Sequence, residues 1–402
     1  MRNRLTGQPS HRPATFAGYL ALVMAAGPLV HFSMSALGPL IVDSLEISAT
    51  QFGLLWFAAF GTASLLSVAG GRMVDRYGAR TMLVALFAVT LLALTLASSA
   101  ASYLWILVAL ALSGVAQSIA NPLTNRLVVS EVPAALHGVV LGIKQSGVQV
   151  GQLFAGLVLP SVAIAFGWRA AVAVCCVPVV VGLLLTPIIV PAAVTASSRS
   201  RAVHTRRPDT HLLLLALFGL LMGAVVQATN VYLPLYAHRE LSASVATSGL
   251  VAAGLGGFGI LGRLFWGRLA SRAQDLGLVL VSMAVIALGA MAVIVLASEL
   301  GLWLLWCGVL MFSFSALAIN VVIMLSIVRA VRLDVVGDAS GWVSLGINLG
   351  FMLGPVMTGL LIDSTLGFSG AWLTLAGIVF FAIVLSVGWR RWRNVSATAR
   401  PA

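Results

Sequence analysis

Long apolar runs alternate with short polar segments along the whole chain, and this pattern predicts the architecture. Each run is about 20 residues long, which is enough for an α-helix to cross the hydrocarbon core of a bilayer. The runs fall at 16–41, 49–71, 81–98, 103–125, 137–160, 169–190, 212–237, 245–266, 276–297, 303–328, 340–364 and 371–389. We therefore predict an all-α membrane protein with twelve transmembrane helices in two pseudo-symmetric six-helix bundles.

A polar, basic segment separates the sixth run from the seventh. Residues 191–211 carry two prolines and several arginines and predict a cytosolic linker. The expected organisation is a cytosolic tail at 1–15, a bundle at 16–190, this linker, a second bundle at 212–389 and a cytosolic tail at 390–402. Such a linker sets orientation and contacts the anionic inner leaflet.

Composition excludes several classes of protein. Apolar residues make up 60% of the 402 residues and charged residues only 8%, whereas soluble domains are about 25% charged. This balance excludes a soluble enzyme, a secreted disulfide scaffold and a disordered chain, and the lipid bilayer becomes the expected partner. The net charge of +12 then relates to the membrane and not to nucleic acid. No phosphate-binding loop, catalytic triad, paired carboxylates or metal-ligand cluster is present, so we expect no enzyme activity, no cofactor and no metal.

Charge placement predicts the orientation of the spans. With both termini in the cytosol, only Arg169 and Arg239 of the 23 basic residues fall in outside loops, and Lys144 falls within a span. Cytosolic loops of membrane proteins carry such an excess of Lys and Arg. The short linker and tails are typical of a multi-pass protein of the bacterial cytoplasmic (inner) membrane.

The second half of the chain repeats features of the first. The hexapeptide Gly71–Arg76 after the second run has a counterpart in Gly267–Arg272 after the eighth. The fifth and eleventh runs carry glycines at nearly the same spacing, which are Gly138, Gly142, Gly147, Gly151 and Gly156, and Gly341, Gly346, Gly350, Gly354 and Gly359. Small residues at this spacing let helix backbones approach closely in lipid.

The segment between the second and third runs resembles the loop signature of the major facilitator superfamily of secondary transporters. It has Gly71, Asp75-Arg76, Gly78 and Arg80 at the family's spacing, but Ala79 where a basic residue is common. The resemblance implies two bundles that rock about a central site near the bilayer midplane. It also implies that these residues form a cytosolic gating loop, with Gly267, Arg268 and Arg272 as its half-copy, in which Ser271 replaces the acid. The competing interpretation is a solvated loop that only sets topology.

Lys144, the only lysine, is the first candidate for contact with substrate, because ionisable groups within a bilayer are costly and are usually functional. It lies in the fifth span about seven residues, or roughly 10 Å, from the cytosolic end. Gln145, Gln149 and Gln152 share one helix face beside it. This polar face predicts a cavity lining in which Lys144 pairs with an anionic substrate. The alternative is a lysine that snorkels to the membrane interface.

His31 is the second candidate, because it lies within the first span and can hydrogen-bond a substrate or carry a proton. A structural contact with a neighbouring backbone is the alternative. All eleven acidic residues fall in loops or at helix ends, so no carboxylate is placed for a proton relay. Secondary polar candidates are Gln117, Asn121, Gln227, Asn230, Asn320 and Asn348.

Three functions remain open at this stage. The first is a monomeric secondary transporter for a small organic anion, with a coupling proton or counter-substrate as a further partner. The second is an efflux carrier for neutral or cationic amphiphiles, which apolar helices with few charges would also suit. The third is a membrane receptor or scaffold that transports nothing.

Overall fold

The chain folds into helices throughout the part that the structure describes, which comprises residues 13–190, 210–330 and 336–398 of this computed structural model. Residues 191–209 of the predicted linker at 191–211, and most of the N-terminal tail, lie outside these residues. Twelve helical segments in the described part are long and apolar enough to cross a membrane. The prediction of an all-helical, twelve-span chain is confirmed.

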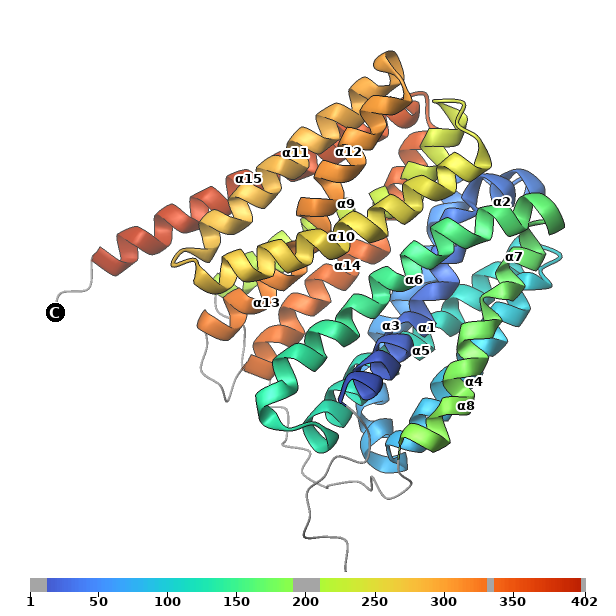
Figure 1. Cartoon of the computed structure of the whole chain (residues 1–402). Coiled ribbons are helices and arrows are strands. Elements are labelled where there is room, and N and C mark those ends of the chain that lie inside the picture. Colours follow the sequence, from blue (N-terminus) through green and yellow to red (C-terminus); the bar gives the residue numbers. More distant parts are fainter. Residues whose placement is uncertain (1–12, 191–209, 331–335, 399–402) are drawn as a thin grey trace, which may run out of the picture.

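Two groups of helices form two bundles (Figure 1, blue to green and yellow to red). The first contains α1 (Pro13–Ala36), α2 (Gly38–Leu45), α3 (Ala49–Tyr77), α4 (Ala79–Ser98), α5 (Tyr103–Glu131), η1 (Ala134–Leu136), α6 (His137–Phe166), α7 (Trp168–Val174) and α8 (Cys176–Ile189). The second contains α9 (Thr210–Arg239), α10 (Val245–Arg272), α11 (Leu276–Leu300), α12 (Leu302–Ser315), η2 (Ala316–Ala318), α13 (Ile319–Ala330), α14 (Val336–Asp363) and α15 (Gly367–Thr398).

The two ends of the bundles differ in charge. We call the end where α1 begins and where α3, α5, α10 and α13 end the basic end. Its described charged groups include Arg72, Arg76, Arg80, Arg268, Arg272 and Arg329. We call the opposite end, where α3 and α10 begin, the far end. Its charged residues include Asp43, Glu46, Arg169, Arg239, Glu240, Glu299 and Asp363.

The structure corrects the expected gating loop. α3 continues through Tyr77, so the segment that starts at Gly71 is helical, and only Gly78 separates α3 from α4. Gly78 has φ of 80°, a left-handed conformation that glycine adopts without strain. The half-copy Gly267–Arg272 is likewise the last part of α10. α15 also continues to Thr398, so most of the expected C-terminal tail is helical.

The central glycines of each series pack their helix against another helix of the same bundle. The close approaches are Gly147–Ala21 and Gly151–Ala25 between α6 and α1, and Gly346–Ala216, Gly350–Leu220 and Gly354–Ala224 between α14 and α9. A Cβ at Gly147 would overlap the carbonyl oxygen of Ala21. Without a hydrophobic force between helices in lipid, such backbone contacts supply much of the packing energy.

We expect Gly147→Ala to destabilise the protein by about 1–3 kcal/mol, because the added methyl must push α6 away from α1. Gly142→Ala is the matched control on the same helix, since no atom lies within 4 Å of the Cβ it would add. That variant should melt at or above the wild-type temperature, because alanine favours a helix over glycine. Thermal unfolding in detergent checks both, and equal melting temperatures would contradict the close packing.

Candidate functional site

Two helix pairs, α3 with α14 and α6 with α10, join the bundles. Gly53 of α3 lies directly against Pro355 of α14, and Gly156 of α6 lies directly against Gly249 of α10. All four residues are nearer the far end than the basic end of their helices. Side chains meet further along the first pair, where the rings of Phe60 and Phe351 lie 5.1 Å apart between centroids.

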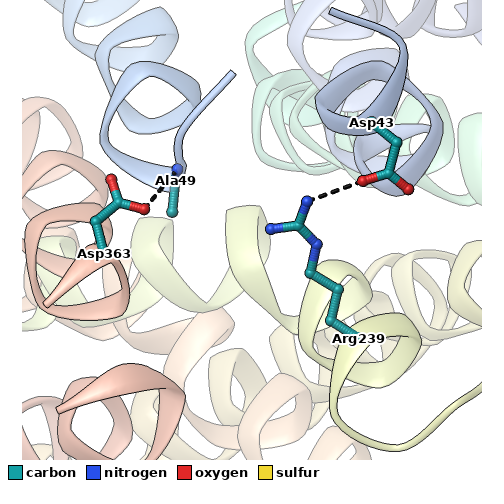
Figure 2. Close-up of polar contacts among 4 residues, drawn as sticks. All are labelled: Asp43, Ala49, Arg239 and Asp363. Atoms are coloured by element: carbon teal, nitrogen blue, oxygen red, sulfur yellow. Dashed lines mark hydrogen bonds and ion pairs between the residues drawn. The ribbon is translucent and has the colours of Figure 1, made fainter. Parts of the chain in front are cut away.

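Polar contacts hold the bundles together at the far end (Figure 2). The carboxylate of Asp363, at the end of α14, accepts hydrogen bonds from the backbone N–H groups of Ala49 (2.9 Å) and Thr50 (2.8 Å) at the start of α3. Arg239 of α9 pairs with Asp43 of α2 at 2.8 Å. We call these two interactions the far-end clasp. Anions are stabilised at helix N-termini by free N–H groups and by the helix dipole.

A buried tyrosine reinforces the clasp. Tyr232 of α9 is fully buried, and its hydroxyl lies 2.7 Å from the carbonyl oxygen of Ala49 and 3.0 Å from that of Pro355. These carbonyls belong to α3 and α14, so one side chain connects both bundles. Together with the glycine contacts, these bonds close the molecule at its far end.

Asn230 of α9 links three helices in the interior. Its side-chain oxygen accepts a hydrogen bond from Gln152 Nε2 at 3.0 Å, and its backbone oxygen accepts one from Ser35 Oγ of α1. The side-chain oxygens of Gln149 and Gln152 are buried and have no hydrogen-bond partner among the described residues. The glutamine face expected on the fifth span therefore lies between the bundles and offers unused acceptors.

Lys144 lies inside the first bundle with a side chain that is 1% exposed. Its ammonium donates to Thr124 Oγ1 at 2.9 Å and to Asn125 Oδ1 at 2.5 Å, both on α5. These partners are neutral, and no carboxylate of the described chain pairs with the lysine. Its burial against α5 does not fit the alternative in which the side chain snorkels to the interface.

His31 lies among aromatic rings and away from charged groups. Its ring centroid is 4.6 Å from that of Phe32 and 5.6 Å from that of Phe60. The side chain is 3% exposed, and Nδ1 has no hydrogen-bond partner within the described structure. Because Phe60 contacts Phe351 of the other bundle, His31 lies next to the surface where the bundles meet.

The other candidate residues differ in how deeply they are buried. Gln227 is buried near Asn230, one turn earlier on α9. Gln117 donates a long hydrogen bond of 3.4 Å to Ser113 and packs against Gly27 of α1. Asn320 and Asn348 are half-buried, whereas Asn121 and Gln145 are exposed in the half of the molecule nearer the basic end.

Two arginines that are not among the candidates from the sequence bind the ends of equivalent helices at the basic end. Arg126 of α5 donates to the carbonyl of Val74 near the end of α3, at 3.0 Å. Arg329 of α13 donates to the carbonyls of Ser271 (2.7 Å) and Ala273 (2.6 Å) at the end of α10. The offset between the glycines of the fifth and eleventh runs is also the offset between Arg126 and Arg329. The internal repeat therefore indicates that the two arginines have equivalent roles. Arg76 stacks 5.3 Å from the Tyr77 ring, and the Asp75 side chain lies outside the described structure.

Arg263 is three residues before the end of the eighth predicted run and lies well inside α10, which continues to Arg272. Its Nε donates to the carbonyl of Leu317 at 3.3 Å. Leu317 belongs to η2, the 3₁₀ turn that separates α12 from α13. The sequence carried the signal for this placement, because the apolar run continues past Arg263 to Trp266.

The sequence matches a known protein family and two named proteins. Residues 15–345 match the profile of the Major Facilitator Superfamily. The chain is 29% identical over 154 residues to the "Hexuronate transporter" of Bacillus subtilis and 26% identical over 154 residues to the "Probable sulfoacetate transporter SauU" of Cupriavidus necator. These stretches cover 37% and 38% of this chain, and the chain spans only 36% of the length of either relative.

Solved structures share the fold over nearly the whole chain. The nucleoside transporter NupG superposes with a TM-score of 0.80 at 14% identity, covering 94% of this chain and 99% of that one. An inward-facing, occupied bacterial homologue of the lysosomal transporter Spinster gives 0.78 at 14% identity, covering 95% and 98%. At this identity the likeness shows the fold alone.

We expect Asp363→Asn to weaken closure at the far end, because an amide loses the negative charge and one of two acceptor oxygens that face Ala49 and Thr50. At this exposed position the loss is about 1 kcal/mol, or a roughly fivefold shift toward states open at the far end. Distance measurements between spin labels at Ser99 and Glu299, in a background without the native cysteines, check this.

Glu240→Gln is the control, because it makes the same acid-to-amide change at the far end and Glu240 takes no part in the clasp. The control should keep the wild-type distance distribution. An unchanged distribution in Asp363→Asn would show that the clasp does not hold the far end closed.

Proposed function

Because the chain belongs to the Major Facilitator Superfamily, we propose that it is a secondary transporter that carries a small organic anion across the cytoplasmic membrane by alternating access. The superfamily and the names of the matched relatives point to a transporter without enzymatic activity, as the sequence predicted. The observation that carries the choice of an anion is Lys144, a buried cation held by neutral partners.

The electrostatics of Lys144 favour an anionic ligand. A charge removed from water is costly unless an opposite charge or several hydrogen bonds compensate it. Thr124 and Asn125 accept hydrogen bonds from the ammonium but bring no charge, and an ammonium has three donors. A substrate carboxylate near Lys144 supplies the missing negative charge, whereas a cationic substrate would be repelled.

The names of the relatives agree with this choice. Hexuronates and sulfoacetate are both organic anions, and the two relatives are named for transporting them. The buried acceptors of Gln149 and Gln152 suit a hydroxylated acid, since hydroxyl groups donate to amide oxygens. We therefore favour small polar carboxylates over amphiphiles, which would need no such acceptors.

The described conformation corresponds to an inward-facing state in this proposal. The excess of arginine at the basic end supports a cytosolic orientation of that end by the positive-inside rule, and we propose both termini to be cytosolic with it. The far-end clasp then closes the outside, and a substrate enters or leaves at the basic end. Asp75, Arg76 and Arg80, beside the Arg126 cap, belong to the surface that closes in the opposite state.

His31 is the candidate for a coupling proton, since no carboxylate lies in the middle of a span. Its imidazole has a free Nδ1 and lies against Phe60 at the junction of the bundles. Rocking of the bundles changes the surroundings of this ring, so its protonation can depend on the transport state.

We expect glucuronate, a hexuronate, or sulfoacetate to raise the melting temperature of the purified protein, because ligands that bind only the native state stabilise it by mass action. Glucose and choline, as neutral and cationic probes, should not. Lys144→Gln keeps hydrogen-bonding capacity but removes the charge, and it should weaken anion binding at least tenfold.

Thr124→Val is the matched variant, because it removes a partner of Lys144 while leaving the ammonium. It should bind the anions nearly as well as wild type even if its own stability falls. Stabilisation of wild type and Lys144→Gln alike by glucose or choline, with no response to either anion, would replace the proposal with an efflux carrier.

A further inference from the structure

We propose that Arg263 binds the carboxylate of the transported anion, so that the substrate is held by one cation from each bundle, Arg263 on α10 and Lys144 on α6. This inference rests on the proposed function and deepens it. It assigns the direct contact with the acid group to a residue of the second bundle, and it specifies a bidentate guanidinium–carboxylate pair as the mode of binding.

The first argument is the position of Arg263 on α10. One turn before it, Gly259 lies 3.3 Å from Leu317 of η2 and 3.8 Å from Gln149 of α6, measured from the Cβ that an alanine would have. Residues four apart share a helix face. Arg263 therefore emerges on the face of α10 that is directed toward α6 and η2, where the two bundles adjoin.

The second argument is the state of its guanidinium. Among the described residues its one hydrogen bond runs from Nε to the carbonyl of Leu317 at 3.3 Å, and no described carboxylate pairs with it. An arginine has five N–H donors. With Nε engaged by a neutral carbonyl, the donors on the two terminal nitrogens remain, and these can form the parallel pair of bonds that a carboxylate accepts.

The 3₁₀ turn η2, which interrupts the tenth span, explains why the Nε of Arg263 binds the Leu317 carbonyl. η2 is a 3₁₀ turn between α12 and α13, and such turns leave carbonyls without their α-helical donors. The Leu317 carbonyl takes a hydrogen bond from Arg263 in place of one within a regular helix. This bond holds the guanidinium at η2, three residues before Asn320 in the first turn of α13.

The third argument is the register of α6 against α10. The helices run antiparallel, because Gly249 contacts Gly156, Gly256 contacts Gln152 and Gly259 contacts Gln149. Continuing this register by one turn places Arg263 opposite Gln145, the exposed amide next to Lys144. The unpartnered oxygen of Gln149 lies between this level and Gln152. This part of the interface thus offers Arg263 and amide groups and no described carboxylate, and Lys144 lies one residue before Gln145 on α6.

Two other arginines of the described chain bind backbone carbonyls with two nitrogens each. Arg329 uses two nitrogens to cap α10. Arg169 at the far end uses Nε and Nη2 on the carbonyl of Ala100. Arg263 differs because it lies within a membrane span, where an ionisable side chain costs free energy and is retained for function.

The arrangement links binding to closure. Lys144 and Arg263 lie on helices of different bundles, and neither has a negative partner among the described residues. In the proposed complex a carboxylate attracts both cations and so favours approach of α6 and α10 at the basic end. Substrate binding then lowers the free energy of the occluded state, which is what alternating access requires.

The experiment measures dissociation constants of the purified, full-length protein for glucuronate and for its neutral amide, glucuronamide. Wild type should prefer the acid at least tenfold. Arg263→Lys keeps the charge but loses the two-pronged geometry, so it should bind glucuronate at least tenfold more weakly than wild type. Arg263→Gln should no longer distinguish the acid from the amide by more than about twofold.

Arg169→Lys is the matched control, because it changes an arginine that also binds a backbone carbonyl but lies at the far end. It should bind glucuronate as wild type does. The melting temperature of each ligand-free variant separates a structural contribution of the Leu317 bond from binding. If Arg263→Lys and Arg263→Gln keep the wild-type affinity and preference while melting earlier, Arg263 is only a brace and the inference is overturned. If wild type itself binds neither glucuronate nor sulfoacetate, the proposed function fails first.

Discussion

Close approach of helix backbones is the constraint on which the structure depends. In lipid, helices gain nothing from burying apolar side chains against one another, so contact must come from surfaces small enough to let backbones meet. α6 uses Gly147 against α1 of its own bundle and Gly156 against α10 of the other, and α14 does the same with Gly350 and Gly359. The same two helices therefore build each bundle and join the pair. The bundles therefore meet partly over glycine surfaces, which present few side chains to each other.

Charge is distributed in a way that complements this packing. Arginines at helix ends satisfy carbonyls that the helices leave free, as Arg126 and Arg329 do at the basic end. Asp363 does the corresponding work for free N–H groups at the far end. The two cations within spans, Lys144 and Arg263, have neutral partners in the described chain. In the described part of the chain, the interior of the spans is thus electropositive, which agrees with the anionic substrate proposed above.

The sequence predicted the twelve spans because apolar runs of about 20 residues admit one physical interpretation, and it predicted the repeat because glycine spacing survives in both halves. It placed Gln149 and Gln152 on one face because helical periodicity is local. It missed the helical end of α3, where Gly71 and several charged residues suggest a loop, although water at a membrane surface solvates them on a helix equally well. It could not predict the contact of Asp363 with Ala49, because those residues are 314 positions apart and meet only through tertiary packing.

The contact between Asp363 and α3 also has a consequence for how this protein can vary. The hydrogen bonds that Ala49 and Thr50 donate to Asp363 come from backbone N–H groups, which are present whatever side chains these two residues carry. Proline is the exception, since it has no N–H to donate. The acid itself has no such freedom, because its charge and both oxygens are used. The contact at the far end thus rests on one acid of α14 and on backbone groups of α3, so the part of it that drift in sequence can remove is the acid.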